Sequence, residues 1–86
     1  NKALEYYKKS YEIKKNVYVD NLNNADIATS LNNIGSVYED KGDYNKALDC
    51  YEKSYNIKKK VYSDNLNHPS LIRTINNIQN LKTKIK

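Results

Sequence analysis

Apolar residues recur along this chain at steps of three and four positions, which is the spacing of one face of an α-helix. The first stripe of this kind predicts an amphipathic helix from about residue 2 to residue 18. Its members are Ala3, Leu4, Tyr7, Tyr11 and Val17. A stripe with the same spacing predicts another long helix from about residue 45 to residue 62. The chain therefore reads as a succession of helices.

Between the two long helices, a further stripe predicts a shorter helix. Its members are Ile27, Leu31, Ile34, Val37 and Tyr38. Gly42 is expected to end this helix, because glycine adopts the left-handed conformation at low cost. Segments rich in Asn and Asp, residues 20–24 and 64–68, follow the long helices and are expected to cap the next helix. Pro69 suits the first turn of a final helix.

The whole pattern repeats with an offset of 44 residues. Asn1 to Leu4 recur as Asn45 to Leu48, and Asp20 to Asn23 recur as Asp64 to Asn67. A fixed period of this length indicates stacked supersecondary units, since a single amphipathic helix pair cannot bury its apolar face alone. The predicted fold is all-α: a right-handed α-solenoid of four helices, arranged as antiparallel pairs around one thin core.

The residues at the expected helix contacts resemble the motifs of the tetratricopeptide repeat (TPR) family. The motif of the family's first helix is matched by Leu31, Ile34, Gly35 and Tyr38. The motif of its second helix is matched by Ala47, Tyr51 and Ser54. In this pattern the small residues let two helices approach closely, and the two tyrosines fill the adjoining space. The resemblance implies one complete repeat over residues 26–62.

The repeat is longer than the usual form and is similar to the long repeats of kinesin light chains. The segments that carry this likeness are Ala28–Gly35, Ile57–Tyr62 and Asn67–Leu71. Residues 1–19 correspond to the second helix of an incomplete repeat. We therefore expect the chain to be part of a longer repeat array, with an apolar face of its first helix open to a partner.

The final helix departs from the family pattern. Gln79 stands at the glycine position and Lys82 at the tyrosine position, so a further helix could not pack there closely. We interpret residues 69–86 as a capping helix with a polar outer face. The open face of the first helix and this polar end also make a homodimer through the first helix an alternative assembly.

Composition and charge narrow the function classes. With 86 residues, of which 38% are hydrophobic, the chain has too little apolar material for a large enclosed active site. Its net charge of +5 favours acidic partners, but acidic residues are interspersed among the lysines, which disfavours nucleic acid. A single cysteine excludes an internal disulfide and favours a reducing compartment, the cytoplasm. No apolar run reaches the roughly 20 residues that a membrane helix needs.

The family resemblance implies a ligand groove on the concave side, lined by the first helices of successive repeats. The residues that it assigns to this groove are Thr29, Asn32, Asn33, Ser36, Glu39, Arg73, Asn76, Asn77, Asn80 and Thr83. Carboxamides both donate and accept hydrogen bonds, so they can hold a peptide backbone of almost any sequence. We expect Asn32 and Asn76 to lie most fully in the groove, and Asn33 and Asn77 to lie closer to the neighbouring helices. Arg73 could bind a carboxylate, and Glu39 could attract a basic residue.

No motif indicates catalysis, a cofactor or a metal ion. His68 and Cys50 each stand alone in the sequence and are interpreted as a cap residue and a packing residue. The acidic residues Glu39, Asp40 and Asp43 surround a turn and are interpreted as solvated. The sequence therefore predicts a protein-interaction module, a scaffold or adaptor that binds a peptide or a partner helix. The alternatives are a self-associating structural fragment and, less favoured, a basic nucleic-acid-binding repeat.

Overall fold

A computed structural model describes residues 2–18 and 24–85 of the chain. In this part of the chain the regular structure is entirely helical, and the helices are α1 (Lys2–Val17), α2 (Ala25–Asp40), α3 (Tyr44–Val61) and α4 (Pro69–Ile85). These bounds confirm the all-α fold and the predicted succession of four helices. The prediction that the second helix is shorter than the first is wrong, because α1 and α2 each have 16 residues. The described residues do not include Asn1, residues 19–23 and Lys86. Part of the expected first link and both chain ends therefore lie outside the described residues.

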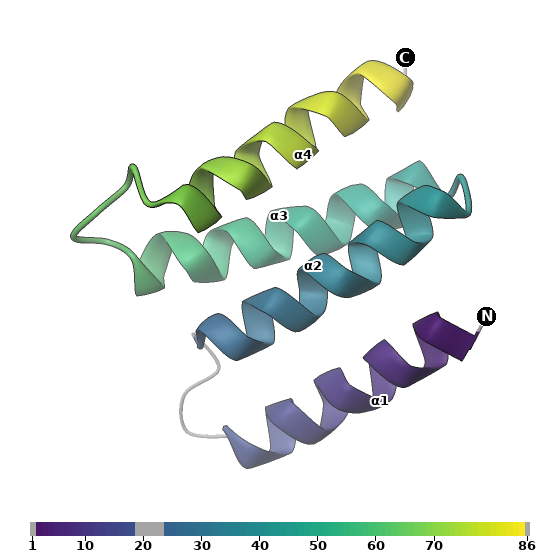
Figure 1. Ribbon diagram of the computed structural model, residues 1–86, viewed down its shortest axis with the longest axis horizontal. Coiled ribbons are helices and arrows are strands. Elements are labelled where there is room, and N and C mark those ends of the chain that lie inside the picture. Colours follow the sequence, from purple (N-terminus) through teal and green to yellow (C-terminus); the bar gives the residue numbers. More distant parts are fainter. Residues whose placement is uncertain (1, 19–23, 86) are drawn as a thin grey trace.

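The helices lie side by side in chain order, and each runs antiparallel to its neighbour (Figure 1). Contacts join α1 to α2, α2 to α3 and α3 to α4, with the largest interface between α2 and α3. The backbone measures 36 × 31 × 15 Å along its principal axes. The molecule is therefore a thin slab with two broad faces, as expected when amphipathic helices bury their stripes only against their immediate neighbours.

The ends of the helices are set by capping and turn residues that can be recognised in the sequence. Gly42 has a φ of 83° and closes the turn between α2 and α3. The Asn24 side chain caps α2 by accepting a hydrogen bond from the amide of Asp26 at 2.8 Å. His68 caps α4 through its Nδ1 atom, which accepts from the amide of Ser70 at 3.1 Å. The predicted roles of Gly42 and His68 are confirmed.

The close approach of α2 and α3 depends on Gly35. A Cβ atom built at this position would lie 2.9 Å from Cε1 of Tyr51 and 3.1 Å from Cβ of Cys50. Real Cβ atoms essentially never come within 3.0 Å of such a neighbour, so only glycine fits without a shift. The small-residue contact that the family resemblance implies is therefore present.

Two adjoining clusters of buried side chains form part of the core within residues 2–18 and 24–85. The first contains Leu4, Ile34 and Cys50, and the second contains Ala47, Tyr51 and Leu81. The half-buried Tyr38 packs against both clusters and links them. The core thus runs from α1 to α4, which makes every helix contribute to one cooperative unit.

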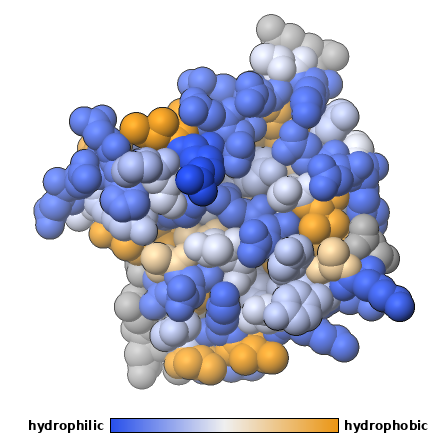
Figure 2. Space-filling view, viewed as in Figure 1, coloured by the Kyte–Doolittle hydropathy of each residue, from blue (hydrophilic) through white to orange (hydrophobic). Residues whose placement is uncertain are grey.

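The two outer helices differ in what they leave exposed. On α1, Tyr6, Ile13 and Val17 are 69%, 62% and 67% exposed, as the prediction of an open apolar face requires. Figure 2 shows orange residues along the lower edge of the molecule, where α1 lies in Figure 1. On α4, the side chains of Gln79 and Lys82 are exposed. Among the described helices, none is long and apolar enough to cross a membrane.

Candidate functional site

The two helices predicted to line the ligand groove, α2 and α4, contact each other through polar side chains. Nδ2 of Asn32 donates a hydrogen bond to Oγ1 of Thr74 at 3.3 Å. Nearer the end of α4, Nζ of Lys84 lies 2.8 Å from Oε2 of Glu39. The residues that were predicted to line the groove therefore lie on two helices, α2 and α4, whose side chains contact each other.

The predicted groove residues are not all equally accessible. Those that are exposed to solvent are Thr29, Asn33, Ser36, Arg73, Asn76, Asn80 and Thr83. Those that are half-buried are Asn32, Glu39 and Asn77. The order expected for α2 is reversed: Asn33 is open to solvent, whereas Asn32 faces α4 and bonds to Thr74. The rotation of α2 about its axis, which packing against α3 and α4 sets, decides which of the two neighbouring residues is accessible.

Glu39 is engaged by the chain itself rather than left free for a basic ligand. Its Oε1 atom accepts a hydrogen bond from the hydroxyl of Tyr51 at 2.9 Å, and its Oε2 atom pairs with Lys84. The hydrogen bond from Lys84 is the main cause that lowers the pKa of Glu39, while partial burial acts in the opposite direction. This carboxylate therefore ties α2 to both α3 and α4. The expectation that Glu39 attracts a basic residue of a ligand is corrected here, because its carboxylate is already paired with Lys84.

A buried lysine occupies the junction of α2, α3 and α4, and the sequence interpretation missed it. Lys58 is only 4% exposed, and its Nζ atom donates to Oγ1 of Thr74 at 3.0 Å. Thr74 in turn donates to the carbonyl of Ser70 at 3.2 Å. Within the described residues no carboxylate pairs with Lys58, and Oδ1 of Asn32 is buried without a hydrogen-bond partner. Burial lowers the pKa of Lys58, and the charge of Arg73 lowers it further.

Replacing Lys58 with methionine is expected to stabilise the fold by about 1 kcal/mol at neutral pH, because it removes a buried charge that lacks a counter-ion. The pKa of Lys58 is lower in the folded chain than its ordinary value of 10.5, so the unfolded chain binds more protons between those two values. The stability of the unsubstituted chain therefore rises with pH over that interval. The advantage of Lys58→Met is greatest below the lowered pKa and is lost by about pH 10.5.

This expectation is checked by urea unfolding, followed by circular dichroism between pH 7 and pH 10.5. The matched control is Lys59→Met, which removes the same charge from an exposed position on the same helix. A destabilised Lys58→Met, or a stability difference that stays constant with pH, would contradict the buried, unpaired state of Lys58.

The structure also contains two grooves that none of the predicted residues line. The first, here the α1–α3 groove, has a volume of about 610 Å³ and lies between α1 and α3 over α2. Its lining residues are Lys8, Tyr11, Glu12, Leu31, Ile34, Tyr38, Asn45, Lys46, Asp49, Cys50 and Lys53. The second, here the α3–α4 groove, has a volume of about 640 Å³. Its lining residues are Asp49, Glu52, Lys53, Tyr55, Asn56, Ile75, Ile78, Gln79 and Lys82.

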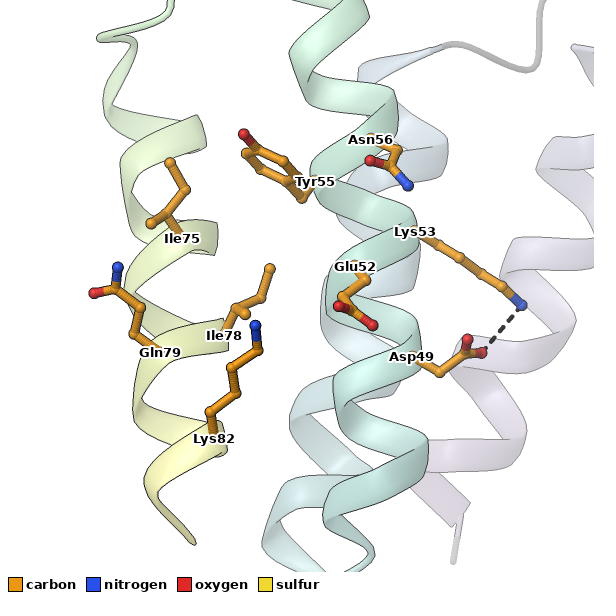
Figure 3. A pocket seen from close by; sticks show the side chains of 9 residues that line it. All are labelled: Asp49, Glu52, Lys53, Tyr55, Asn56, Ile75, Ile78, Gln79 and Lys82. Atoms are coloured by element: carbon orange, nitrogen blue, oxygen red, sulfur yellow. Dashed lines mark ion pairs between the residues drawn. The ribbon is translucent and has the colours of Figure 1, made fainter. Parts of the chain in front are cut away.

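The 44-residue repeat relates these two grooves. Shifted by this offset, Tyr11, Leu31 and Ile34 of the α1–α3 groove become Tyr55, Ile75 and Ile78 of the α3–α4 groove. Figure 3 shows Tyr55 on α3 and Ile78 on α4 pointing into the space between these helices, with Ile75 also on α4. The repeat in the sequence is the signal that could have located both grooves, but only packing shows that they are open.

No group of three or more His, Cys, Asp or Glu side chains within residues 2–18 and 24–85 is arranged to hold a metal ion. Cys50 is a free, buried cysteine that packs in the core, and burial raises the pKa of its thiol.

Comparison with known proteins identifies one family. The family model described as "Tetratricopeptide repeat" matches residues 1–60 and, in a second alignment, residues 26–78. The comparisons with curated proteins and with solved structures give no match. The family match covers all four helices at least in part, whereas the likeness to kinesin light chains remains a prediction.

Proposed function

Since the chain belongs to the tetratricopeptide repeat family, whose repeats generally mediate protein–protein interaction, we propose that it is a scaffold or adaptor module that binds a peptide or a partner helix across α2 and α4. The module does no chemistry of its own and acts in a reducing compartment such as the cytoplasm. Its repeats are of the long, kinesin light chain-like form.

The observation that carries this proposal is a set of exposed carboxamides on α2 and α4, two helices that contact each other through side chains. The side chains of Asn33, Asn76 and Asn80 are exposed, and within the described residues none of them makes a hydrogen bond to the chain. Each offers two donors and one acceptor group to the main chain of a ligand. The face shown in Figure 2 is mostly hydrophilic, which suits recognition through hydrogen bonds.

Charge supports an acidic ligand. Arg73 is exposed on α4 and can grip a carboxylate with two parallel hydrogen bonds. The nearby Lys58 adds positive potential from inside the junction, because it has no carboxylate partner among the described residues. Glu39, the acidic member of the predicted set, is already paired with Lys84. The surface is therefore expected to prefer peptides with at least one acidic residue.

The test is a selection of phage-displayed 12-residue peptides on the immobilised chain, followed by calorimetry of the selected peptides. The variant that combines Asn33→Ala, Arg73→Ala and Asn76→Ala is expected to bind them at least tenfold more weakly. The control variant combines Asn56→Ala, Lys59→Ala and Lys60→Ala, which are exposed positions on α3. If the control loses as much affinity as the α2–α4 variant, or if neither loses any, peptides are not bound across α2 and α4.

A second candidate, self-association through α1, is favoured by a specific observation. The exposed residues Tyr6, Ile13 and Val17 follow one another at steps of seven and four positions along one face of α1. An apolar stripe of this spacing can pack against another helix. Sedimentation equilibrium over a wide concentration range separates this candidate, since only self-association makes the mass depend on concentration.

A further inference from the structure

We propose that the α1–α3 groove is a second protein-binding site, separate from the surface of α2 and α4. Its occupant is a peptide segment in which one bulky apolar side chain stands next to an acidic residue. This inference does not depend on the proposed function, because it rests on different side chains, although residues of α2 contribute to both surfaces.

The floor of the groove is apolar and already protected from water. Leu31, Ile34 and Cys50 are 5%, 4% and 9% exposed, and they lie beneath the opening between α1 and α3. The half-buried rings of Tyr11 and Tyr38 line the same groove. A volume of about 610 Å³ can accept a large aliphatic or aromatic side chain, and burying such a side chain removes its apolar surface from water.

Positive charge gathers at the Tyr38 end of the groove. The Nζ atoms of Lys8, from α1, and of Lys46, from α3, each lie 5.6 Å from the centroid of the Tyr38 ring. Lys46 pairs with Asp43 at 3.6 Å, whereas Lys8 pairs with no carboxylate among the described residues. The interaction with Tyr38 raises the pKa of Lys8 above its ordinary value of 10.5.

The acidic residues of the rim do not offset this charge. Glu12 is paired with Lys15 at 3.6 Å, and Asp49 is paired with Lys53 at 3.1 Å. A ligand carboxylate near Tyr38 would therefore meet the ammonium group of Lys8, which has no carboxylate partner among the described residues, next to Lys46, which is paired with Asp43. The combination of an apolar floor and this unbalanced charge defines the occupant as apolar and acidic.

Other occupants fit this groove less well. A second copy of the chain carries a net charge of +5 and would bring further lysines to Lys8 and Lys46. The related α3–α4 groove has Lys82 in the place of Tyr38, so it lacks the aromatic ring against which the two lysines lie. The proposal therefore concerns the α1–α3 groove alone.

The experiment uses the single cysteine of the chain as a reporter within the site. Phage-displayed 12-residue peptides are selected on the variant that lacks Asn33, Arg73 and Asn76 (each replaced by alanine), so that binding across α2 and α4 is removed. The selected peptides are synthesised and added to the unsubstituted chain, and alkylation of Cys50 by iodoacetamide is followed by mass spectrometry. Peptides seated on the groove floor are expected to slow alkylation at least fivefold.

Matched charge reversals test the acidic part of the ligand. The double variant Lys8→Glu with Lys46→Glu is expected to bind the selected peptides at least tenfold more weakly. The control, Lys9→Glu with Lys60→Glu, makes the same charge change at exposed positions outside the groove and is expected to lose less than twofold. Circular dichroism melting of both variants verifies that they are folded.

Each outcome of these experiments either supports the proposed site or overturns it. The site is supported if the selected peptides combine acidic and bulky apolar residues, slow the alkylation of Cys50, and bind more weakly when Lys8 and Lys46 are replaced. The proposed site would be overturned by any of three results. No peptide is recovered, the peptides leave the alkylation of Cys50 unchanged, or the peptides bind both charge variants equally well. Cys50 protection is measured on the unsubstituted chain, so the proposal stays testable even if a charge variant fails to fold. Failure here leaves the α2–α4 test untouched, since that test uses other variants.

Discussion

Gly35→Leu is expected to destabilise the fold by about 2 kcal/mol, which is a large part of the stability of a domain of this size. Even a single Cβ atom at this position would lie 2.9 Å from the ring of Tyr51. That ring cannot easily move, because it is 2% exposed and its hydroxyl is bonded to Glu39. Leucine has a better helix propensity than glycine by about 0.8 kcal/mol, which offsets only part of the cost.

The measurement is urea unfolding followed by circular dichroism, and the control is Gln79→Leu. Gln79 is the residue that stands 44 positions after Gly35, and its side chain is exposed on α4. There the same new side chain meets no buried ring, so the change in stability is expected to stay within about 0.5 kcal/mol. Equal effects of the two substitutions would mean that α2 and α3 do not approach closely at Gly35.

Leu81→Ala is expected to cost about 3 kcal/mol, the usual loss for a fully buried leucine. Leu81 is 0% exposed and forms one cluster with Ala47 and Tyr51 of α3. Since the slab is thin, its neighbours have few other apolar groups with which to fill the cavity. The loss should appear as a lower midpoint in urea and as faster hydrogen exchange of the α4 amides.

Ile72→Ala on the same helix is the matched control, because Ile72 is 41% exposed. We expect it to change the stability by less than about 1 kcal/mol. A neutral Leu81→Ala would show that α4 is not packed on α3 as described. It would also remove the structural basis for binding across α2 and α4, because the position of α4 depends on this cluster.

The two proposed sites offer different kinds of side chain to a partner. Across α2 and α4 the accessible groups are polar, with Asn33, Arg73 and Asn76 exposed. In the α1–α3 groove the floor is apolar and the lysines stand at the rim. We therefore propose that the module holds two partners at once, one by hydrogen bonds to the partner's main chain and one by an inserted side chain of the partner.

Most of the fold could be predicted, because it depends on local rules. The steps of three and four residues locate the helices, Gly42 ends α2, and the motif around Gly35 and Tyr51 predicts the closest helix contact. The candidate site was less predictable. Its residues lie on the predicted helices, but Asn32 is bonded to Thr74, and Glu39 is bonded to a lysine 45 positions away.

What the amino-acid sequence settled, then, is the succession of helices, their turns and the family. These follow from periodicity and from backbone conformations that act over a few residues. Only the tertiary structure decided which side chains are free to bind. The burial of Lys58, which reads as one of three consecutive surface lysines, depends on where α4 crosses α3. The opening between α1 and α3 likewise depends on how two helices, which share few contacts, are spaced by α2. Helix geometry sets the faces of each helix, but the rotation and spacing of packed helices decide which face meets water.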